Sequence, residues 1–300
     1  MRYCISTFVL IALCSPLLAQ GAPKTVFEGR KEILYADGWA SPKRWGPSEC
    51  TVTASKERLA DGRPTVHMYI PVDHFAGEKK YPIGWPRMGL TPIAGWEKDW
   101  TNFDTIEFSI YTESTRTKLP KSPLSFGLYC PDRSRSLSRP LNELKLNQWV
   151  KFSYSITKLK IVDTVKRVAF NISESSYKHE DQLHFYIGGF RFVRSAECEL
   201  NEMKAAAGAV FQGQPSIDVE VEVVGVPKGI SRAVPFTLRL GDKVIRAESL
   251  PVHRGRYVMA MDISELKLAQ GTYTLVVFEG EADKTKTATF RVVNNPWKEQ

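Results

Sequence analysis

Short segments of alternating apolar and polar residues, separated by Pro, Gly, Asn and Asp, restrict this chain to an all-β fold. Each places Val, Ile, Leu or Phe on one face and polar or aromatic side chains on the other, which is typical of half-buried strands. The first group comprises residues 65–70, 106–111, 124–129, 150–154, 168–172 and 183–187. No window of a dozen residues there carries a helical stripe. We expect a jelly roll or a related antiparallel sandwich over residues 23–196.

A second group of alternating segments occupies residues 215–300. It comprises residues 217–223, 236–240, 257–261, 273–277 and 288–292. The number of strands and the length are those of a smaller immunoglobulin-like (Ig-like) sandwich, without the Cys pair and central Trp of antibody-type domains. Residues 197–214 contain a run of helix formers, Met203–Gly208, and we interpret them as a linker with one short helix.

The first 22 residues are typical of a secretory signal peptide. Arg2 supplies a positive charge, residues 8–14 form an apolar run, and small residues follow at 19–22. Pro16 ends the apolar run well short of the roughly 18 residues that a membrane-spanning helix needs. We expect a protein that is secreted, periplasmic or at the cell surface and is not embedded in a membrane.

The charge and the cysteines exclude several classes of function. A formal net charge of +8 is too mild for a dedicated nucleic-acid binder, so we expect no nucleic-acid partner. Cys50, Cys130 and Cys198 remain after cleavage of the signal, which allows at most one intramolecular disulfide. No Cys or His spacing is typical of a metal site, and we expect neither a metal nor another cofactor.

Motifs of catalysis are absent from the sequence. It contains no G-x-S-x-G elbow, H-E-x-x-H pair, phosphate-binding Gly loop or paired E-x-D-x-x-E carboxylates. Asp218, Glu220 and Glu222 alternate, so we expect all three on the solvent face of a strand. His67 and His184 are expected on outward strand faces, either lining a groove or simply at the surface.

Tryptophan is concentrated in loop-like sequence near the start of the chain. Five of the seven Trp residues lie between residues 39 and 100, at Trp39, Trp45, Trp85, Trp96 and Trp100. Trp in Pro- and Gly-rich loops indicates either an exposed platform or a plug at the edge of a sandwich.

The segment Lys80–Gly89 is the strongest candidate for a platform. Two prolines and two glycines restrict its backbone, Tyr81 and Trp85 offer flat apolar faces, and Arg87 offers a fork of donors. Flat aromatic faces suit the C–H faces of pyranose rings, and planar donors suit hydroxyl pairs or a carboxylate. The predicted carbohydrate-binding residues are Tyr81, Trp85, Arg87, Trp96, Trp39 and Trp45. Packing of Trp85 onto the sandwich remains an equal alternative.

Basic residues form a second candidate site. Residues 116–139 contain six basic residues and one acidic residue, Asp132. The basic residues are Arg116, Lys118, Lys121, Arg133, Arg135 and Arg139. Such a cluster is either a solvated loop or a patch for an anionic polymer, because Arg forks bind carboxylate and sulfate bidentately. We select Arg133, Arg135 and Arg139 as the candidate patch for a uronate-containing or sulfated glycan.

Four segments resemble the galactose-binding-like jelly rolls that occur as carbohydrate-binding modules in exported polysaccharide-degrading systems. They are Trp100–Tyr111, Leu146–Phe152, Val168–Ile172 and Asp181–Phe190, which are similar to the family patterns "W..FD.i.F.iY", "l..W..v" and "gD.ldfYiDdi". The resemblance covers residues 25–195. It implies a jelly roll that binds polysaccharide without catalysis.

Two further sequence features qualify the resemblance. Gly188 and Gly189 stand where the family tends to carry acidic residues near a structural calcium, so no calcium site is expected. Leu268–Leu275 is similar to the "G-x-Y-x-L" turn and strand of bacterial Ig-like and fibronectin-type modules. This implies a second domain that acts as a spacer or docking module.

Two other functions stay open at this point. One is a polysaccharide lyase or glycoside hydrolase that uses the groove of the jelly roll, with Tyr69, His67, Arg87 and His184 as its candidate residues. The other is an adhesion or structural protein of the cell surface. The lack of catalytic motifs favours binding over chemistry.

Overall fold

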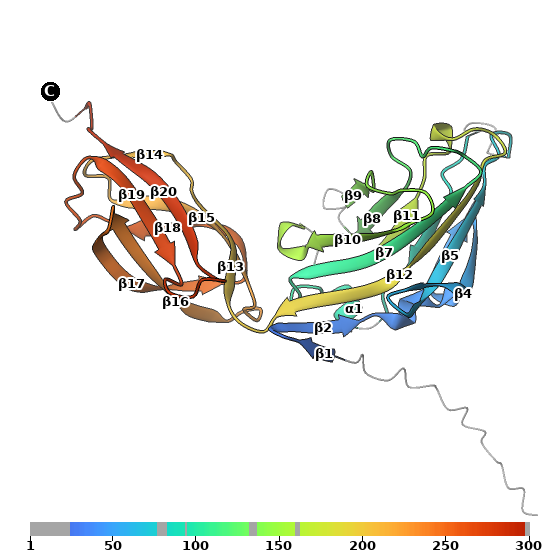
Figure 1. Ribbon diagram of the computed structural model, residues 1–300, viewed down its shortest axis with the longest axis horizontal. Coiled ribbons are helices and arrows are strands. Elements are labelled where there is room, and N and C mark those ends of the chain that lie inside the picture. Colours follow the sequence, from blue (N-terminus) through green and yellow to red (C-terminus); the bar gives the residue numbers. More distant parts are fainter. Residues whose placement is uncertain (1–24, 77–82, 94, 132–136, 160–162, 298–300) are drawn as a thin grey trace, which may run out of the picture.

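The computed structural model describes residues 25–76, 83–93, 95–131, 137–159 and 163–297. Over these ranges it confirms the expected all-β fold, with one short α-helix, α1 (Gly95–Lys98). Short 3-10 helices are η1 (Asp37–Ala40), η2 (Pro42–Arg44), η4 (Ile156–Lys158) and η5 (Glu174–Ser176). Figure 1 shows two lobes, here called the first and the second sandwich, which meet where β12 leads into β13. No helix in these ranges is long and apolar enough to cross a membrane.

The first sandwich is a jelly roll of two antiparallel sheets. The seven-stranded sheet has the order β1-β2-β12-β5-β4, and β7 joins the other edge of β12 and carries β10. The five-stranded sheet has the order β3-β6-β11-β8-β9. The strands are β1 (Thr25–Glu28), β2 (Lys31–Tyr35), β3 (Trp45–Ser48), β4 (Thr51–Ala60), β5 (Arg63–Pro71), β6 (Arg87–Leu90), β7 (Thr105–Ser114), β8 (Ser125–Tyr129), β9 (Leu137–Pro140), β10 (Trp149–Ser155), β11 (Arg167–Asn171) and β12 (Gln182–Ser195).

Aromatic rings from the two sheets of this sandwich pack together in its core. The ring centroid of Phe108 in β7 lies 4.9 Å from that of Phe126 in β8 and 5.5 Å from that of Phe170 in β11. All three side chains are buried. The alternation read from the sequence therefore predicts which face of each strand is buried, since successive side chains point to opposite faces.

Gly188 and Gly189 allow the close packing of β12. A Cβ at Gly188 would lie 2.8 Å from the carbonyl oxygen of Pro64, and Gly189 has a φ of +63°. The register of β12 against β7 shifts between Gly188 and Arg191. Close approach of β5 and a β-bulge thus require glycine at both positions.

The second sandwich also contains two sheets. One has the order β13-β15-β18 and the other β14-β20-β19-β16-β17, with only the β14–β20 pair parallel among the described strands. Its hydrophobic core shares no residue with that of the first sandwich. The strands are β13 (Glu199–Ala205), β14 (Ala209–Phe211), β15 (Ser216–Val224), β16 (Ser231–Leu240), β17 (Lys243–His253), β18 (Gly255–Asp262), β19 (Gly271–Val277) and β20 (Lys286–Val293).

The expectation of a linker with a short helix at residues 197–214 is wrong. Most of this segment forms β13, which pairs with β15, and β14, which pairs with β20. Leu200, Met203 and Val210 are buried in the core of the second sandwich. Tertiary pairing and burial outweigh the intrinsic helix propensity of the Ala-rich run.

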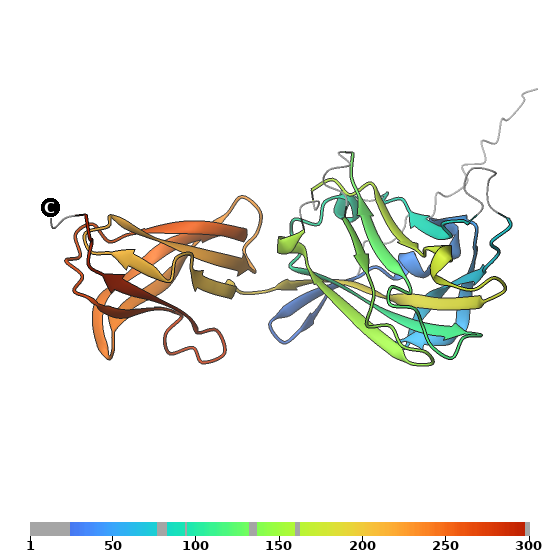
Figure 2. The same cartoon turned by 90° about the horizontal axis from the view of Figure 1, so that it is seen from above.

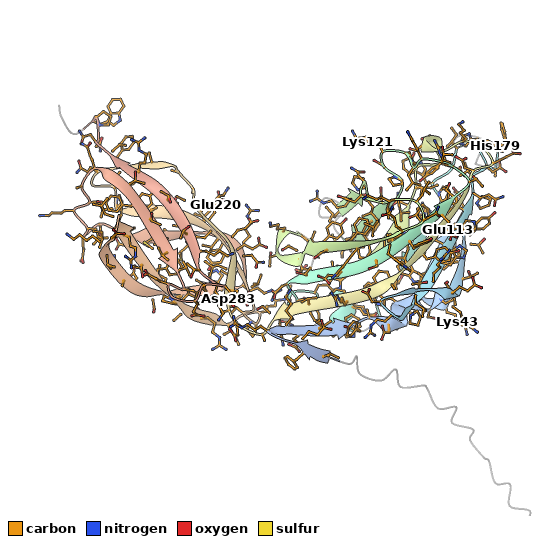
Figure 3. All side chains as sticks on the ribbon, viewed as in Figure 1. Lys43, Glu113, Lys121, His179, Glu220 and Asp283 are labelled. Atoms are coloured by element: carbon orange, nitrogen blue, oxygen red, sulfur yellow. The ribbon has the colours of Figure 1, made fainter. Side chains whose placement is uncertain are left out.

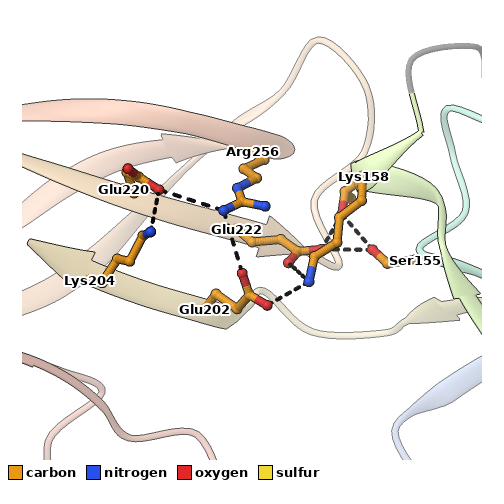
Figure 4. Close-up of polar contacts among 8 residues, drawn as sticks. Ser155, Lys158, Glu202, Lys204, Glu220, Glu222 and Arg256 are labelled. Atoms are coloured by element: carbon orange, nitrogen blue, oxygen red, sulfur yellow. Dashed lines mark hydrogen bonds and ion pairs between the residues drawn. The ribbon is translucent and has the colours of Figure 1, made fainter. Parts of the chain in front are cut away.

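Buried charges cross the junction between the two sandwiches. Glu222 in β15, which was expected at the surface, is only 1% exposed and accepts a hydrogen bond of 2.7 Å from Ser155 Oγ. It also accepts one from Thr157 and pairs with Lys158 Nζ at 3.4 Å (Figure 4). These three partners belong to the first sandwich, so contacts across the junction bury Glu222. Figure 2 shows the two sandwiches end to end in the view from above. Asp218 and Glu220 keep access to solvent.

Candidate functional site

The outward face of the five-stranded sheet carries a hollow of about 300 Å³. We call it the sheet hollow; it is lined by Trp85, Arg87, Tyr129, Ser138, Arg167, Ala169 and Asn171. Trp85 and Arg87, two of the residues predicted for the platform, therefore lie beside residues of β8, β9 and β11.

The strand register explains why this face is hollowed. A row of small residues crosses all five strands: Gly46, Gly89, Ala169, Gly127 and Ser138 are successive cross-strand partners. Their side chains are too small to fill the space above the sheet, whereas alternate residues such as Met88, Phe126 and Phe170 point into the core.

Tyr129 and Arg167 lie across two of these glycines. A Cβ at Gly127 would lie 2.9 Å from Tyr129 Cε2, and a Cβ at Gly89 would lie 2.9 Å from Arg167 Cδ. The guanidinium carbon of Arg167 is 4.4 Å from the centroid of the Tyr129 ring. The two glycines therefore allow a stacked cation and aromatic ring to lie close to the sheet.

The segment that carries Trp85 is held by two carboxylates. Gly84 N–H donates to Glu174 Oε2, and Trp85 N–H donates to Glu49 Oε2, each at 2.8 Å. Glu174 is itself buried. The backbone is thus fixed while the Trp85 side chain stays 55% exposed, as a preorganised stacking surface requires.

Two buried polar atoms in the sheet hollow have no hydrogen-bond partner among the described residues. They are Arg167 Nε, a donor, and Asn171 Oδ1, an acceptor. The two residues are four apart in β11 and share its outward face. Leaving such atoms unsatisfied costs about 1–3 kcal/mol each. A ligand hydroxyl, which both donates and accepts, satisfies atoms of this kind.

The prediction that Trp39 and Trp45 form part of a binding platform is wrong. Trp39 is fully buried and Trp45 is 4% exposed. Trp39 Nε1 donates to Glu97 at 2.9 Å, and Trp45 Nε1 donates to the carbonyl of Trp39 at 2.7 Å. Both rings close one end of the first sandwich, and no face is left for a ligand.

Trp96 is half-buried in the same aromatic cluster. Its ring is stacked on Trp39 with the centroids 6.3 Å apart, and it meets Phe192 edge-on at 5.6 Å. It does not line the sheet hollow. The structure therefore separates Trp96 from Trp85.

Of the remaining predicted residues, Tyr81, Arg133 and Arg135 lie outside the described residues. Arg139 is exposed in β9, but it does not line the sheet hollow, whose β9 residue is Ser138. Its charge instead acts on Tyr154, whose pKa is raised to about 12, chiefly by burial, with Arg139 opposing the rise.

The other basic residues of the predicted cluster separate. Arg116 pairs with Asp181 at 3.2 Å, so its charge is compensated. Lys118 and Lys121 line a wide hollow of about 590 Å³ together with Lys145, here called the lysine hollow. Figure 3 shows Lys121 on the rim of the first sandwich. Lys145 follows the basic run by only six residues and was not predicted as part of it.

The residues considered for catalysis do not assemble as one set. His67 Nε2 lies 3.0 Å from His184 Nδ1, and the rings of Tyr69 and His184 are 4.8 Å apart, on the outward face of the seven-stranded sheet. Burial and the neighbouring His184 lower the pKa of His67. Arg87 lies on the opposite sheet. No three His, Cys, Asp or Glu side chains in the described ranges are placed to hold a metal ion.

Four polar residues of the sheet hollow were not predicted from the sequence, namely Tyr129, Ser138, Arg167 and Asn171. Their approach depends on the cross-strand register of β8, β9 and β11. The only local signal was the occurrence of Gly89 and Gly127 inside strand-like sequence, which often marks close approach of another group.

The fold and the site define a two-sandwich, all-β protein with a polar and aromatic hollow on one sheet face. A scan of protein-family models finds no match. A search of curated proteins finds no similar sequence.

Among solved structures, an exo-beta-agarase is 8% identical, with 51% of this chain and 23% of that chain covered and a TM-score of 0.36. The chain thus spans about a quarter of that enzyme. CBM27-1 of Caldicellulosiruptor saccharolyticus in complex with mannohexaose is 13% identical, with 55% and 97% covered and a TM-score of 0.34. The CBM22-1 xylan-binding domain of Paenibacillus barcinonensis Xyn10C is 14% identical, with 56% and 95% covered and a TM-score of 0.30.

Proposed function

We propose that this protein binds a polysaccharide in the sheet hollow without catalysing a reaction on it. The observation that carries the proposal is the position of the exposed Trp85 ring beside Arg167 and Asn171, whose buried polar atoms lack partners among the described residues. An aromatic face binds the C–H face of a sugar ring, and its hydroxyls satisfy the polar atoms.

The chemistry of the sheet hollow favours binding over hydrolysis. None of its described lining residues is Asp or Glu. Glycoside hydrolysis ordinarily requires a pair of carboxyl groups on either side of the scissile bond. The groups present are donors, acceptors and aromatic rings, which stabilise a bound sugar in its ground state.

The charge of the sheet hollow favours an acidic glycan. Arg87 and Arg167 both line it, and neither forms an ion pair with a described residue. Guanidinium groups bind carboxylate and sulfate through parallel hydrogen bonds. The proposed ligand is therefore a uronate-containing or sulfated polysaccharide.

The remaining parts of the chain fit this proposal. The signal-like residues 1–22 would export the protein to the compartment in which polysaccharides occur. The second sandwich, in the role expected of an Ig-like module, would act as a spacer or docking unit. We propose a first domain at residues 23–196 and a second domain that begins with β13 (Glu199–Ala205) rather than at residue 215.

The test is a calorimetric titration of residues 23–300 with polygalacturonate, a sulfated galactan, mannan and xylan. We expect saturable binding of an acidic glycan, and Trp85→Ala should weaken it by about 1–3 kcal/mol, or 5- to 150-fold. Trp297→Ala removes a Trp that is 77% exposed and outside the sheet hollow, so it is the matched control.

The proposal fails if folded Trp85→Ala binds as tightly as the wild type, or if no glycan of the set binds. Product analysis after long incubation should show neither reducing ends nor unsaturated sugars. Release of either product would favour the alternative of a glycoside hydrolase or a polysaccharide lyase.

A further inference from the structure

A second hollow, of about 580 Å³, lies between the two sandwiches. We call it the junction hollow. The first sandwich contributes Thr101, Ile156, Thr157 and Leu159, and the second contributes residues 228–231 and 253–255. Its volume falls within the range of about 300–1,000 Å³ that is usual for small-molecule sites, which often occur between domains.

The two walls of the junction hollow are fixed by hydrogen bonds and ion pairs. Asp104 of the first sandwich accepts from Ser195 N–H at 2.6 Å and from Gly225 N–H at 3.3 Å. Arg254 Nη2 of the second sandwich lies 2.7 Å from Asp104 Oδ1. Together with the contacts of Glu222, these bonds hold the hollow open in one shape.

Arg254 is the buried group of the junction hollow that can still bind a ligand. Its side chain is only 9% exposed, it lines the hollow, and its Nη1 has no hydrogen-bond partner among the described residues. Asp104 is already bonded by Ser195 and Gly225. One edge of the guanidinium therefore remains for an acceptor from outside the chain.

The rest of the lining indicates the chemistry of that acceptor. Ile156, Leu159 and Ile230 supply apolar surface, and Thr101, Thr157 and Ser231 supply hydroxyl groups. The charged groups at the walls are Arg254 with Asp104, and Lys228 with Asp99 at 3.4 Å. Each acid is paired with a base, and among the described residues of the lining the buried side-chain atom left without either an ion-pair or a hydrogen-bond partner is Arg254 Nη1.

We propose that the junction hollow binds a small sugar acid, with its carboxylate on Arg254 and one face of its ring on Ile156, Leu159 and Ile230. The carboxylate matches the guanidinium fork, the ring offers an apolar C–H face, and the sugar hydroxyls face the threonine and serine side chains. This site is separate from the sheet hollow and does not depend on Trp85.

The test uses glucuronate as the probe and glucose as its neutral counterpart, measured by calorimetry on residues 23–300. Trp85→Ala is the background, so that any binding in the sheet hollow is weakened. We expect saturable glucuronate binding and at least tenfold weaker binding of glucose. Ile230→Trp, which fills the hollow from a side chain that is 44% exposed, should lower the glucuronate affinity at least tenfold.

Val244→Trp is the matched control, because Val244 is 45% exposed and does not line the junction hollow. Arg254→Lys should reduce glucuronate binding, since it keeps the charge and removes the fork. The inference is overturned if folded Ile230→Trp binds glucuronate as the background does, if glucose binds equally well, or if glucuronate does not bind. Ile230→Trp in the wild-type chain should leave polysaccharide binding unchanged, which separates this test from that of the sheet hollow.

Discussion

Arg254 of the second sandwich forms a buried ion pair with Asp104 of the first, at 2.7 Å between Nη2 and Oδ1. Asp104 lies just before β7 in the segment Trp100–Tyr111, on which the resemblance to jelly-roll binding modules rests. Its carboxylate also accepts the backbone N–H groups of Ser195 and Gly225. One side chain thus connects β7, the end of β12 and the second sandwich.

Asp104→Ala should therefore destabilise the protein strongly. It leaves Arg254 buried without a counter-charge, and breaking a buried pair in this way costs about 3–5 kcal/mol. Urea unfolding followed by Trp fluorescence measures the change. Arg30→Ala is the control, because Arg30 and its partner Asp283 are 51% and 67% exposed, and an exposed pair contributes about 0–1 kcal/mol. Figure 3 shows Asp283 at the same junction. Equal effects of the two substitutions would contradict the assignment.

Gly127→Ala should weaken polysaccharide binding while the fold stays intact. The added Cβ meets the end of the Tyr129 ring at 2.9 Å, so the ring has to move away from its stack with Arg167. Loss of an aromatic contact of this kind costs about 0.5–1.5 kcal/mol. Calorimetry with an acidic glycan that binds the wild-type protein measures the loss. Gly208→Ala is the control, since nothing lies within 4 Å of its added Cβ, and equal affinities of both variants would refute the prediction.

Binding of an acidic glycan should weaken as salt rises. The Debye length is about 10 Å at 0.1 M and about 3 Å at 1 M, so added salt screens the attraction of Arg87 and Arg167. Arg87→Ala should lower the affinity at low salt and flatten the salt dependence. Lys118→Ala, in the separate lysine hollow, should change neither. If Lys118→Ala flattens the dependence instead, the acidic glycan binds in the lysine hollow.

The free energy of unfolding should decrease as the pH falls below about 6.5, because of His67. Burial and the contact with His184 lower the pKa of His67 in the folded state, below the value of about 6.5 of an unfolded chain. As the pH falls through this window the unfolded state binds the proton first, so the free energy of unfolding decreases. His67→Gln should show a smaller decrease between pH 7 and pH 5 in thermal melts. A decrease as large as that of the wild type would show that His67 is not responsible.

The local pattern of the sequence determined most of the strands and which of their faces are buried. Phe108, Phe126 and Phe170 alternate with polar or small residues, and each occupies the core face that its strand predicts. The Pro- and Gly-rich sequence around Trp85 indicated a restrained backbone, but it left open whether the ring is exposed or packs onto the sandwich. Such features depend on neighbours along the chain, and period-two alternation records them directly.

Only the tertiary structure decided which residues far apart in the sequence meet. Trp39 has the same loop-like surroundings as Trp85, yet other Trp and Phe rings close over it. Glu222 alternates like a surface residue, but the first sandwich covers it. Gly127, Arg167 and Asn171 become one site through the pairing of β8 with β11. Burial by another sheet and cross-strand register are not encoded in local periodicity, because both depend on how separate segments pack in space.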